Sequence, residues 1–204
     1  MIHPHTKLVE IRDVSGVGIV ATKLIPKGTI TWCRDDLDIA LSARELRKLP
    51  DAMHSSFLKH AYLSESGTYI LNWDDGRYQN HSCDPTSCLL PGLDCEIALR
   101  DIAVGEQITS DYATYNLDHG FDCFCGCPAC RSKVLPADKA VRVKALSLEV
   151  MAALACFDSV SQPLAILGES FPQPEAIASF LGKKTSVASG TQRSFIERFL
   201  RSAK

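Results

Sequence analysis

The chain has 204 residues, of which 46% are hydrophobic and 23% charged, and its formal net charge is -2. These values are typical of a globular protein and argue against intrinsic disorder. The small charge gives no general attraction to nucleic acid or to an anionic membrane, so we expect direct binding to neither. We find no apolar run of membrane-spanning length and no signal-peptide core. We therefore expect a cytoplasmic protein, or a nuclear one if the host is eukaryotic, and not a secreted one.

The first two thirds of the chain predict an α+β fold made mostly of short strands. Six short runs, many of them rich in β-branched residues and separated by Gly and Pro, have strand character. They lie at residues 8–11, 18–21, 29–32, 68–72, 95–100 and 107–110.

A helical insert interrupts these strands at about residues 42–63. Ser42-Ala-Arg-Glu45 fits a capping box, and apolar residues follow at helical spacing. After Pro50, a second apolar pattern predicts another amphipathic helix. Its members are Met53, Phe57, Leu58 and Ala61. Charged residues of both signs stand in this insert, so its composition indicates no preferred partner.

Beyond Arg131 the pattern becomes helical. One apolar stripe consists of Val143, Leu146, Val150, Met151 and Leu154, a second of Ile177, Phe180 and Leu181, and a third of Phe195, Ile196, Phe199 and Leu200. The polar stretch 182–192 predicts a loop. We expect three units: 1–117, a short cysteine-rich segment at 118–131, and a helical tail at 132–204.

Three short segments carry polar or glycine-rich patterns that are weak when taken singly. Ser15-Gly-Val-Gly-Ile-Val-Ala21 fits either a tight turn or a close approach of the backbone to a ligand. The segment 77–85 offers an amide, an imidazole and a thiol at Asn80, His81 and Cys83, although turn chemistry and a buried histidine explain it equally well. The segment 105–112 is a turn into a strand that ends in a tyrosine, and by itself it predicts only a half-buried aromatic side chain.

The cysteines give the strongest local signal. Four of the nine fall within eight residues, at Cys123, Cys125, Cys127 and Cys130. Structural disulfides are rare in a reducing compartment, and thiolates this close together favour a tetrahedral zinc ion. The alternative is a set of free, partly buried thiols.

Taken in this order, the four segments resemble the SET-domain lysine methyltransferases that carry a cysteine-rich post-SET segment. The resemblance runs from about Lys7 to Arg131, with a variable insert between Asp36 and Gly67. It implies a β-clip fold with knot-like C-terminal threading and a post-SET zinc loop. It also implies methyl transfer from S-adenosylmethionine to a protein lysine, with Tyr112 as the catalytic tyrosine.

The resemblance assigns cofactor contacts residue by residue. Those implied are Gly16, Val17, Gly18, Arg77, Asn80, His81, Tyr112 and Phe124. Tyr78 and Gln79 follow Arg77 where the family has an aromatic and an aliphatic residue, which is a mild departure. Ser110 is a further departure, because the family usually has an aromatic residue two positions before its catalytic tyrosine. A smaller residue favours higher methylation states unless another side chain, such as Tyr69 or Tyr115, fills the gap.

The resemblance also implies one closed, structural zinc site. Its ligands would be Cys83, Cys123, Cys125 and Cys130. Cys127 is then a bystander, although it could replace one of the others. Such a site would pin the post-SET segment against the active site, where Phe121 or Phe124 could form a wall of the lysine channel.

Several rival functions use the same residues. A SET-like module that only binds a peptide or partner is the first, and cofactor binding would separate it from an enzyme. A zinc hydrolase or deaminase lacks the required strings and an open coordination position. A cysteine hydrolase would pair Cys83 with His81, but we expect these side chains to point to opposite faces of an extended segment. A zinc-ribbon nucleic-acid binder lacks a basic, aromatic-rich patch.

The expected partner is a protein or peptide that presents a lysine, with a histone or histone-like protein as the best-known case for this family. The insert is expected to form part of the substrate groove. The tail beyond residue 132 would either help to form the lysine channel or mediate dimerisation, and the sequence does not distinguish these roles.

Overall fold

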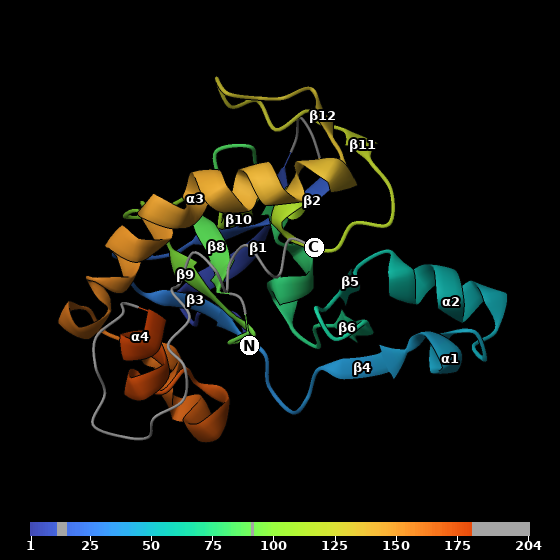
Figure 1. Cartoon of the computed structure of the whole chain (residues 1–204), viewed down its shortest axis with the longest axis horizontal. Coiled ribbons are helices and arrows are strands. Elements are labelled where there is room, and N and C mark those ends of the chain that lie inside the picture. Colours follow the sequence, from blue (N-terminus) through green and yellow to red (C-terminus); the bar gives the residue numbers. More distant parts are fainter. Residues whose placement is uncertain (12–15, 91, 181–204) are drawn as a thin grey trace.

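The computed structural model describes residues 1–11, 16–90 and 92–180, and the polypeptide forms several small sheets with a helical C-terminal part (Figure 1). The described strands are β1 (Thr6–Ile11), β2 (Gly16–Ala21), β3 (Ile30–Cys33), β4 (Ile39–Ser42), β5 (Tyr62–Leu63), β6 (Thr68–Leu71), β7 (Asn80–His81), β8 (Ser87–Leu90), β9 (Cys95–Ala98), β10 (Thr109–Ser110), β11 (Phe121–Asp122) and β12 (Lys133–Val134). The α-helices are α1 (Ala43–Leu46), α2 (Asp51–Leu58), α3 (Lys139–Leu154) and α4 (Pro174–Phe180). Short 3-10 turns lie at Asp75–Tyr78, Tyr112–Thr114, Pro136–Asp138, Phe157–Ser159 and Pro163–Ser170.

The main hydrophobic core lies between the sheet β3-β9-β8 and helix α3, which crosses that sheet in Figure 1. Every residue of β3 and β9 is buried, as expected for strands covered on both faces. Helix α3 contributes Val143, Leu146, Val150 and Leu154 at helical spacing. The prediction of this apolar stripe is confirmed, and α3 is thereby fixed to the body that carries β9.

The hairpin β1-β2 covers a second cluster of buried side chains. Its register pairs Thr6 with Ala21 at the open end and Ile11 with Gly16 beside the turn. Gly16 adopts a φ of +82°, in the left-handed region where glycine carries no penalty. Ile19 on β2 is fully buried and packs into the cluster that contains Trp32.

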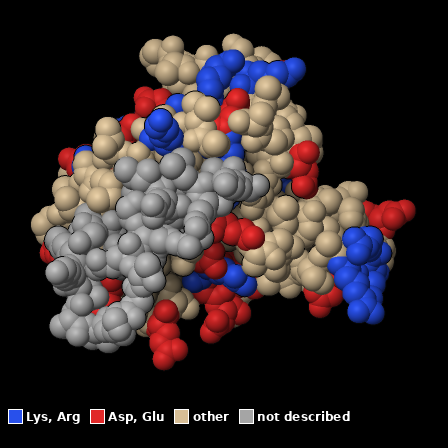
Figure 2. Space-filling model, viewed as in Figure 1, with Lys and Arg blue, Asp and Glu red and all other residues tan. Residues whose placement is uncertain are grey.

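The insert forms its own small sheet, in the order β4-β6-β5, with α1 and α2 at its tip (Figure 1). The register of β4 and β6 pairs Ile39 with Leu71 and Ser42 with Thr68. The capping box predicted at Ser42 is confirmed, because its hydroxyl accepts from the backbone N–H of Glu45 while the Glu45 carboxylate accepts from the N–H of Ser42. The helix predicted after Pro50 is also confirmed as α2. Acidic and basic side chains are mixed over the face in Figure 2, with a basic group at the insert tip.

Two segments far apart in sequence meet as a parallel pair. Strand β7 lies beside β10, with Asn80 opposite Thr109 and His81 opposite Ser110. Because Tyr112 lies two residues beyond the end of β10, this pairing brings the Asn-His motif next to the tyrosine. This strand pairing therefore holds the segments 77–85 and 105–112 together in one site.

The C-terminal part agrees with the expected helical tail as far as it is described. Ile177 of α4 is buried in the main core. The third apolar stripe and the polar loop predicted at 182–192 lie outside the described residues. Among the described residues no single helix is long and apolar enough to cross a membrane, and only the pair Pro136–Ser159 and Pro163–Ser170, bent by 103°, meets that length and composition together.

Candidate functional site

A cavity of about 520 Å³ lies where the glycine hairpin, the insert and the segments 76–80 and 112–121 meet. This volume is in the range of pockets that hold small-molecule ligands. The predicted residues Val17, Arg77, Asn80 and Tyr112 all line it. The four segments identified in the sequence thus supply residues to one site or to the cysteine cluster beside it.

Tyr112 begins a 3-10 turn, and Asp111 caps that turn by accepting from the backbone N–H of Ala113. The Tyr112 hydroxyl donates to the backbone carbonyl of Gln79 at 2.5 Å. Burial, with a smaller contribution from the negative charge of Glu96, raises the pKa of Tyr112 to about 12. The phenol therefore stays protonated at neutral pH and acts as a hydrogen-bond donor and not as a base.

An aromatic cluster surrounds the Tyr112 ring. The ring centroids of His81, Phe121 and Tyr115 lie 5.4, 6.0 and 6.1 Å from it. Phe121 lines the cavity, whereas Phe124 is 72% exposed and does not line it. Of the two phenylalanines expected at the channel wall, Phe121 is the one that the structure brings to the cavity.

Asn80 connects the glycine hairpin to the segment before Tyr112. Its side-chain Nδ2 donates to the backbone carbonyl of Val17 at 2.9 Å and to Oε1 of Gln107 at 3.0 Å. A Cβ added at Gly18 would come within 2.6 Å of both side-chain amides, so Gly18 is required by packing. A Cβ at Gly16 would meet nothing within 4 Å among the described residues.

Four polar atoms on cavity-lining residues are buried without a hydrogen-bond partner among the described residues. They are Nε1 of Trp32, Oη of Tyr62, Oδ1 of Asn72 and Nε of Arg77. Unsatisfied buried polar groups are rare and costly in native proteins. A polar ligand in the cavity would give these atoms partners, and Arg77 is among the residues predicted to bind one.

Glu96 is a cavity residue that the sequence analysis did not single out. It lies on β9, is 2% exposed and lines the cavity. Its Oε2 accepts from Nε2 of Gln79 at 2.6 Å and from the hydroxyls of Ser110 and Ser87 at 2.8 and 2.9 Å, and its Oε1 accepts from the hydroxyl of Tyr115. One glutamate inside a short apolar run gave no local signal of this role, because the donors come from four other segments.

The same hydrogen-bond network shows what lies beside the small side chain of Ser110. That residue is 1% exposed, and its hydroxyl is hydrogen-bonded to Gln79 and Glu96. The space beside the small side chain is therefore occupied by polar groups. Tyr115, one of the two residues expected to fill the gap, reaches the same carboxylate.

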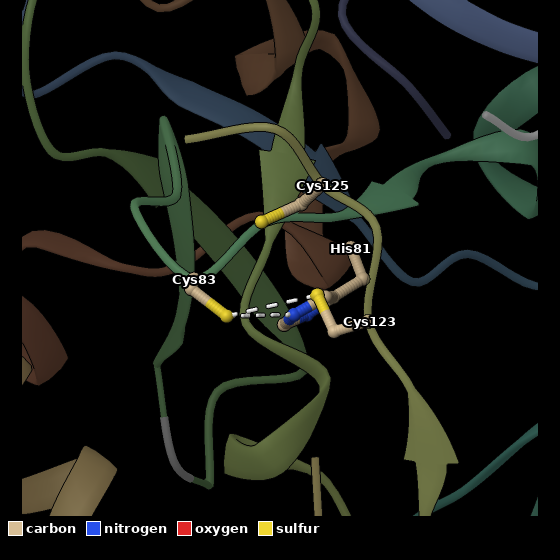
Figure 3. Close-up of side chains that lie close together, drawn as sticks. All are labelled: His81, Cys83, Cys123 and Cys125. Atoms are coloured by element: carbon tan, nitrogen blue, oxygen red, sulfur yellow. Dashed lines mark hydrogen bonds between the residues drawn. The ribbon is translucent and has the colours of Figure 1, made fainter. Parts of the chain in front are cut away.

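The cysteine cluster adjoins His81, whose ring centroid lies 5.4 Å from that of Tyr112. Donor atoms of His81, Cys83, Cys123 and Cys125 all lie within 4.8 Å of one another, and Figure 3 shows the four side chains converging. Sulfur and imidazole nitrogen are donors that zinc prefers. The donor set therefore fits a metal ion.

The remaining two cysteines of the segment stand at the margin of this group. Sγ of Cys130 lies 3.7 Å from Sγ of Cys123, and Sγ of Cys127 lies 3.5 Å from Sγ of Cys125. The structure thus groups three of the four predicted ligands, Cys83, Cys123 and Cys125, with His81, and it places Cys130 beside Cys123. Which four would bind a metal stays a prediction.

The expected separation of Cys83 from His81 is wrong. Nε2 of His81 lies 3.4 Å from Sγ of Cys83. Residues two apart on an extended segment point to the same side, so strand alternation favours this contact. Burial lowers the pKa of His81 to about 4, against the opposing effect of Asp111, and the neutral ring accepts the backbone N–H of Tyr112 at Nδ1.

Asp111 ties the cysteine segment and α3 to the residue before Tyr112. Its side chain is fully buried, and it accepts from Nη2 of Arg131 and from Nε of Arg142, each at 2.6 Å. Arg142 also donates to the backbone carbonyl of Cys83 at 3.0 Å. The tail therefore contributes directly to the support of the site, although no residue beyond Phe121 lines the cavity in the described part of the chain.

Comparison with known proteins agrees with this arrangement. The sequence pattern of the SET domain matches residues 16–113, which include the glycine-rich strand β2, the Asn-His motif and Tyr112. These residues form a SET domain, and the many short strands followed by a C-terminal helix have the SET-domain fold that the sequence predicted.

Two Arabidopsis thaliana proteins are similar in sequence. One, provisionally named histone-lysine N-methyltransferase ASHH4, is 31% identical over 146 residues, which are 63% of this chain and 39% of the relative. The other, histone-lysine N-methyltransferase ATX2, is 29% identical over 109 residues, which are 44% of this chain and 10% of the relative. The chain thus spans well under half the length of these relatives. The crystal structure of the methyltransferase domain of human histone-lysine N-methyltransferase SETMAR matches at 19% identity with a TM-score of 0.46, over 66% of this chain and 58% of that one.

Proposed function

We propose that this protein transfers methyl groups from S-adenosylmethionine to the side-chain amine of a lysine in a protein substrate. The observation that carries the proposal is the position of Tyr112. In a chain of the SET-domain family, its hydroxyl is held by the Gln79 carbonyl at a cavity of ligand size. When bound, S-adenosylmethionine supplies an activated methyl group on a sulfonium.

The cavity suits an amine that must react without its proton. A lysine ammonium has a pKa of about 10.4 in water and carries no free lone pair at neutral pH. The rings of Tyr112, Tyr115 and Phe121 exclude water, and desolvation lowers the pKa of an amine that enters. Methyl transfer is an in-line displacement, so alignment of the two partners accounts for much of the rate.

Tyr112 serves this alignment. Its phenol remains protonated because burial raises its pKa, and its ring is fixed by three aromatic neighbours. It orients the amine and does not remove the proton. A histidine ring in water has a pKa of about 6.5 and is charged at acid pH. Burial lowers the pKa of His81 to about 4 and so keeps its ring uncharged at neutral pH.

The residues predicted to hold the cofactor fit a polar ligand of this size. Gly16 leaves its side of the turn open, Val17 lines the cavity, and Nε of Arg77 lacks a partner among the described residues. Asn80 fixes the backbone of Val17. Phe124, 72% exposed, would need to pack on the cofactor from outside the cavity.

We further propose one structural zinc ion held by Cys83, Cys123, Cys125 and Cys130. The close approach of these sulfur atoms supports it, and His81 is the competing fourth ligand. The ion would hold the segment that carries Phe121 against Tyr112. Loss of the ion would then reduce activity by loosening the channel wall, without direct participation in the reaction.

The substrate is proposed by analogy with the names of the relatives, which are histone-lysine N-methyltransferases. A histone or a histone-like protein is the first candidate, and the insert lines the cavity at residues 58–63, where the substrate would enter. A cytoplasmic or nuclear location is part of the same proposal.

The test combines binding with turnover. Isothermal titration with S-adenosylhomocysteine, with zinc quantified on the same sample, is expected to give micromolar binding and about one zinc per chain. A peptide array with radiolabelled S-adenosylmethionine would then identify a substrate. Tyr112→Phe is expected to abolish transfer and leave cofactor binding nearly unchanged. All five tyrosines of the chain line the cavity, so a Tyr→Phe change at another position cannot serve as a control. The control is therefore the cofactor affinity of Tyr112→Phe itself.

Two results would contradict the proposal. Undiminished turnover of Tyr112→Phe would remove Tyr112 from the reaction. Absence of cofactor binding in a zinc-loaded sample would favour the second candidate function, a SET-like module that binds a peptide or a partner.

A further inference from the structure

Glu96 presents a buried carboxyl group that the proposed reaction does not use. Buried carboxylates are almost always paired with a cation or a metal ion, because an unpaired charge is costly away from water. Among the described residues no lysine, arginine or histidine forms an ion pair with Glu96. Its partners are the neutral side chains of Gln79, Ser87, Ser110 and Tyr115.

The hydrogen bonds are distributed unevenly over the two carboxylate oxygens. Three donors converge on Oε2, whereas Oε1 accepts only from Tyr115 within the described parts of the chain. An ionised carboxylate offers about four lone pairs, two on each oxygen. One lone pair of Oε1 is therefore left for a donor from outside, and Glu96 lines the same cavity as Tyr112.

The carboxylate is also rigidly placed. Gln79 connects it to the reacting end of the cavity, because its side chain donates to Glu96 while its backbone carbonyl accepts from the Tyr112 hydroxyl. Ser87 is completely buried and is held in turn by Thr31 at 2.6 Å. An anion fixed by several donors keeps its position when a cation arrives, which is the condition for strong electrostatic recognition.

We propose that Glu96 recognises the positive charge at the reacting end of the cavity, binding the substrate's ammonium group and the methylated ammonium product. The inference rests on the proposed function. It adds a specificity-determining residue for a cationic side chain of about the length of lysine and predicts discrimination against an uncharged side chain of the same length.

The charge also assists the displacement. The amine lone pair forms the C–N bond while the C–S bond breaks and its electron pair stays on sulfur. The nitrogen thereby changes from neutral to cationic, and the proton leaves afterwards to solvent. A fixed anion in the cavity stabilises the nitrogen as it becomes charged. The same anion opposes loss of the proton from the substrate ammonium before the reaction. Glu96 therefore assists through substrate binding and through stabilisation of the transition state.

Sinefungin tests the inference without a known substrate. This analogue of S-adenosylmethionine carries an amino group, cationic at neutral pH, where the methyl sulfonium stands, whereas S-adenosylhomocysteine is neutral there. We expect Glu96→Gln to weaken sinefungin about 10- to 100-fold, the range for a lost hydrogen bond to a charged group. S-adenosylhomocysteine should change less than about threefold. Glu96→Asp, which keeps the charge, should restore part of the sinefungin affinity.

The outcomes separate this inference from the proposed function. The control is Glu149→Gln, the same change at an exposed position of α3, which should alter neither affinity. If both ligands bind the unaltered protein and Glu96→Gln weakens both equally or weakens neither, the inference is overturned while the proposed function stands. If neither ligand binds the unaltered protein, the proposed function fails and the inference fails with it.

Discussion

Replacing Asp111 by Asn should destabilise the protein strongly, because this one buried carboxylate forms ion pairs with two arginines. The Asp111 side chain is fully buried, and Arg131 and Arg142 each donate to it at 2.6 Å. Removing one partner of a buried ion pair costs about 3–5 kcal/mol. Since both arginine side chains are 21% exposed and keep some access to water, we expect about 3 kcal/mol, the lower end.

The assay is thermal unfolding with zinc in excess, so that metal loss does not contribute. For a chain of this size 1 kcal/mol corresponds to about 2–4 °C, which gives a decrease in Tm of about 6–12 °C. The matched control is Asp122→Asn. Asp122 is 70% exposed and lies 4.0 Å from Lys133, so its pair contributes at most about 1 kcal/mol. A difference of less than about 3 °C between the two variants would refute the argument that Asp111 joins the tail to the site.

Three further predictions concern other parts of the molecule. Gly18→Ala should weaken S-adenosylhomocysteine at least about tenfold, since its Cβ would lie 2.6 Å from two side-chain amides. Gly67→Ala, whose Cβ would meet nothing within 4 Å among the described residues but whose φ of +77° is strained, controls for a general loss of stability in the titration. Cys83→Ser should lose zinc and activity together, while elemental analysis and turnover should show that Cys156→Ser keeps both; full zinc in the first variant would mean that Cys127 or His81 is the fourth ligand instead. Burial lowers the pKa of His3 to about 4, so the unfolded state binds more protons than the folded state between about pH 6.5 and 4. Stability should therefore fall as the pH falls through that window. In His3→Asn the urea midpoint should depend less on pH, and parallel curves for the two proteins would contradict this assignment.

The strand and helix pattern was readable from the sequence because it depends on local chemistry. The capping box at Ser42 and the apolar stripe of α3 are examples in which short-range hydrogen bonds and helical spacing decide the structure. The order of the four motifs then indicated the family, which the SET-domain match confirms. The assignments of cofactor and metal ligands remain predictions that the geometry supports.

Long-range pairings were the part that the sequence could not supply. Glu96 stands in a short apolar strand, and nothing near it in the chain predicts donors from Gln79, Ser110 and Tyr115. Arg142 likewise reads as a solvent-facing residue of an amphipathic helix until α3 is placed against Asp111. The contact of His81 with Cys83 was predictable from strand alternation and was missed by incorrect reasoning about their faces.

The pairing of Ile39 with Leu71 has a consequence for how such proteins diversify. Directly opposed residues of an antiparallel ladder have Cα atoms about 4.5–5.5 Å apart, so the whole insert leaves and rejoins the body at nearly one point. A segment attached in this way is a cassette. It can be lengthened, shortened or exchanged for one from another protein while the two flanking chain ends keep their spacing. Because residues 58–63 of this cassette border the cavity, each exchange would present a new surface to the incoming peptide, while Tyr112 and Glu96, which lie outside the cassette, keep their places.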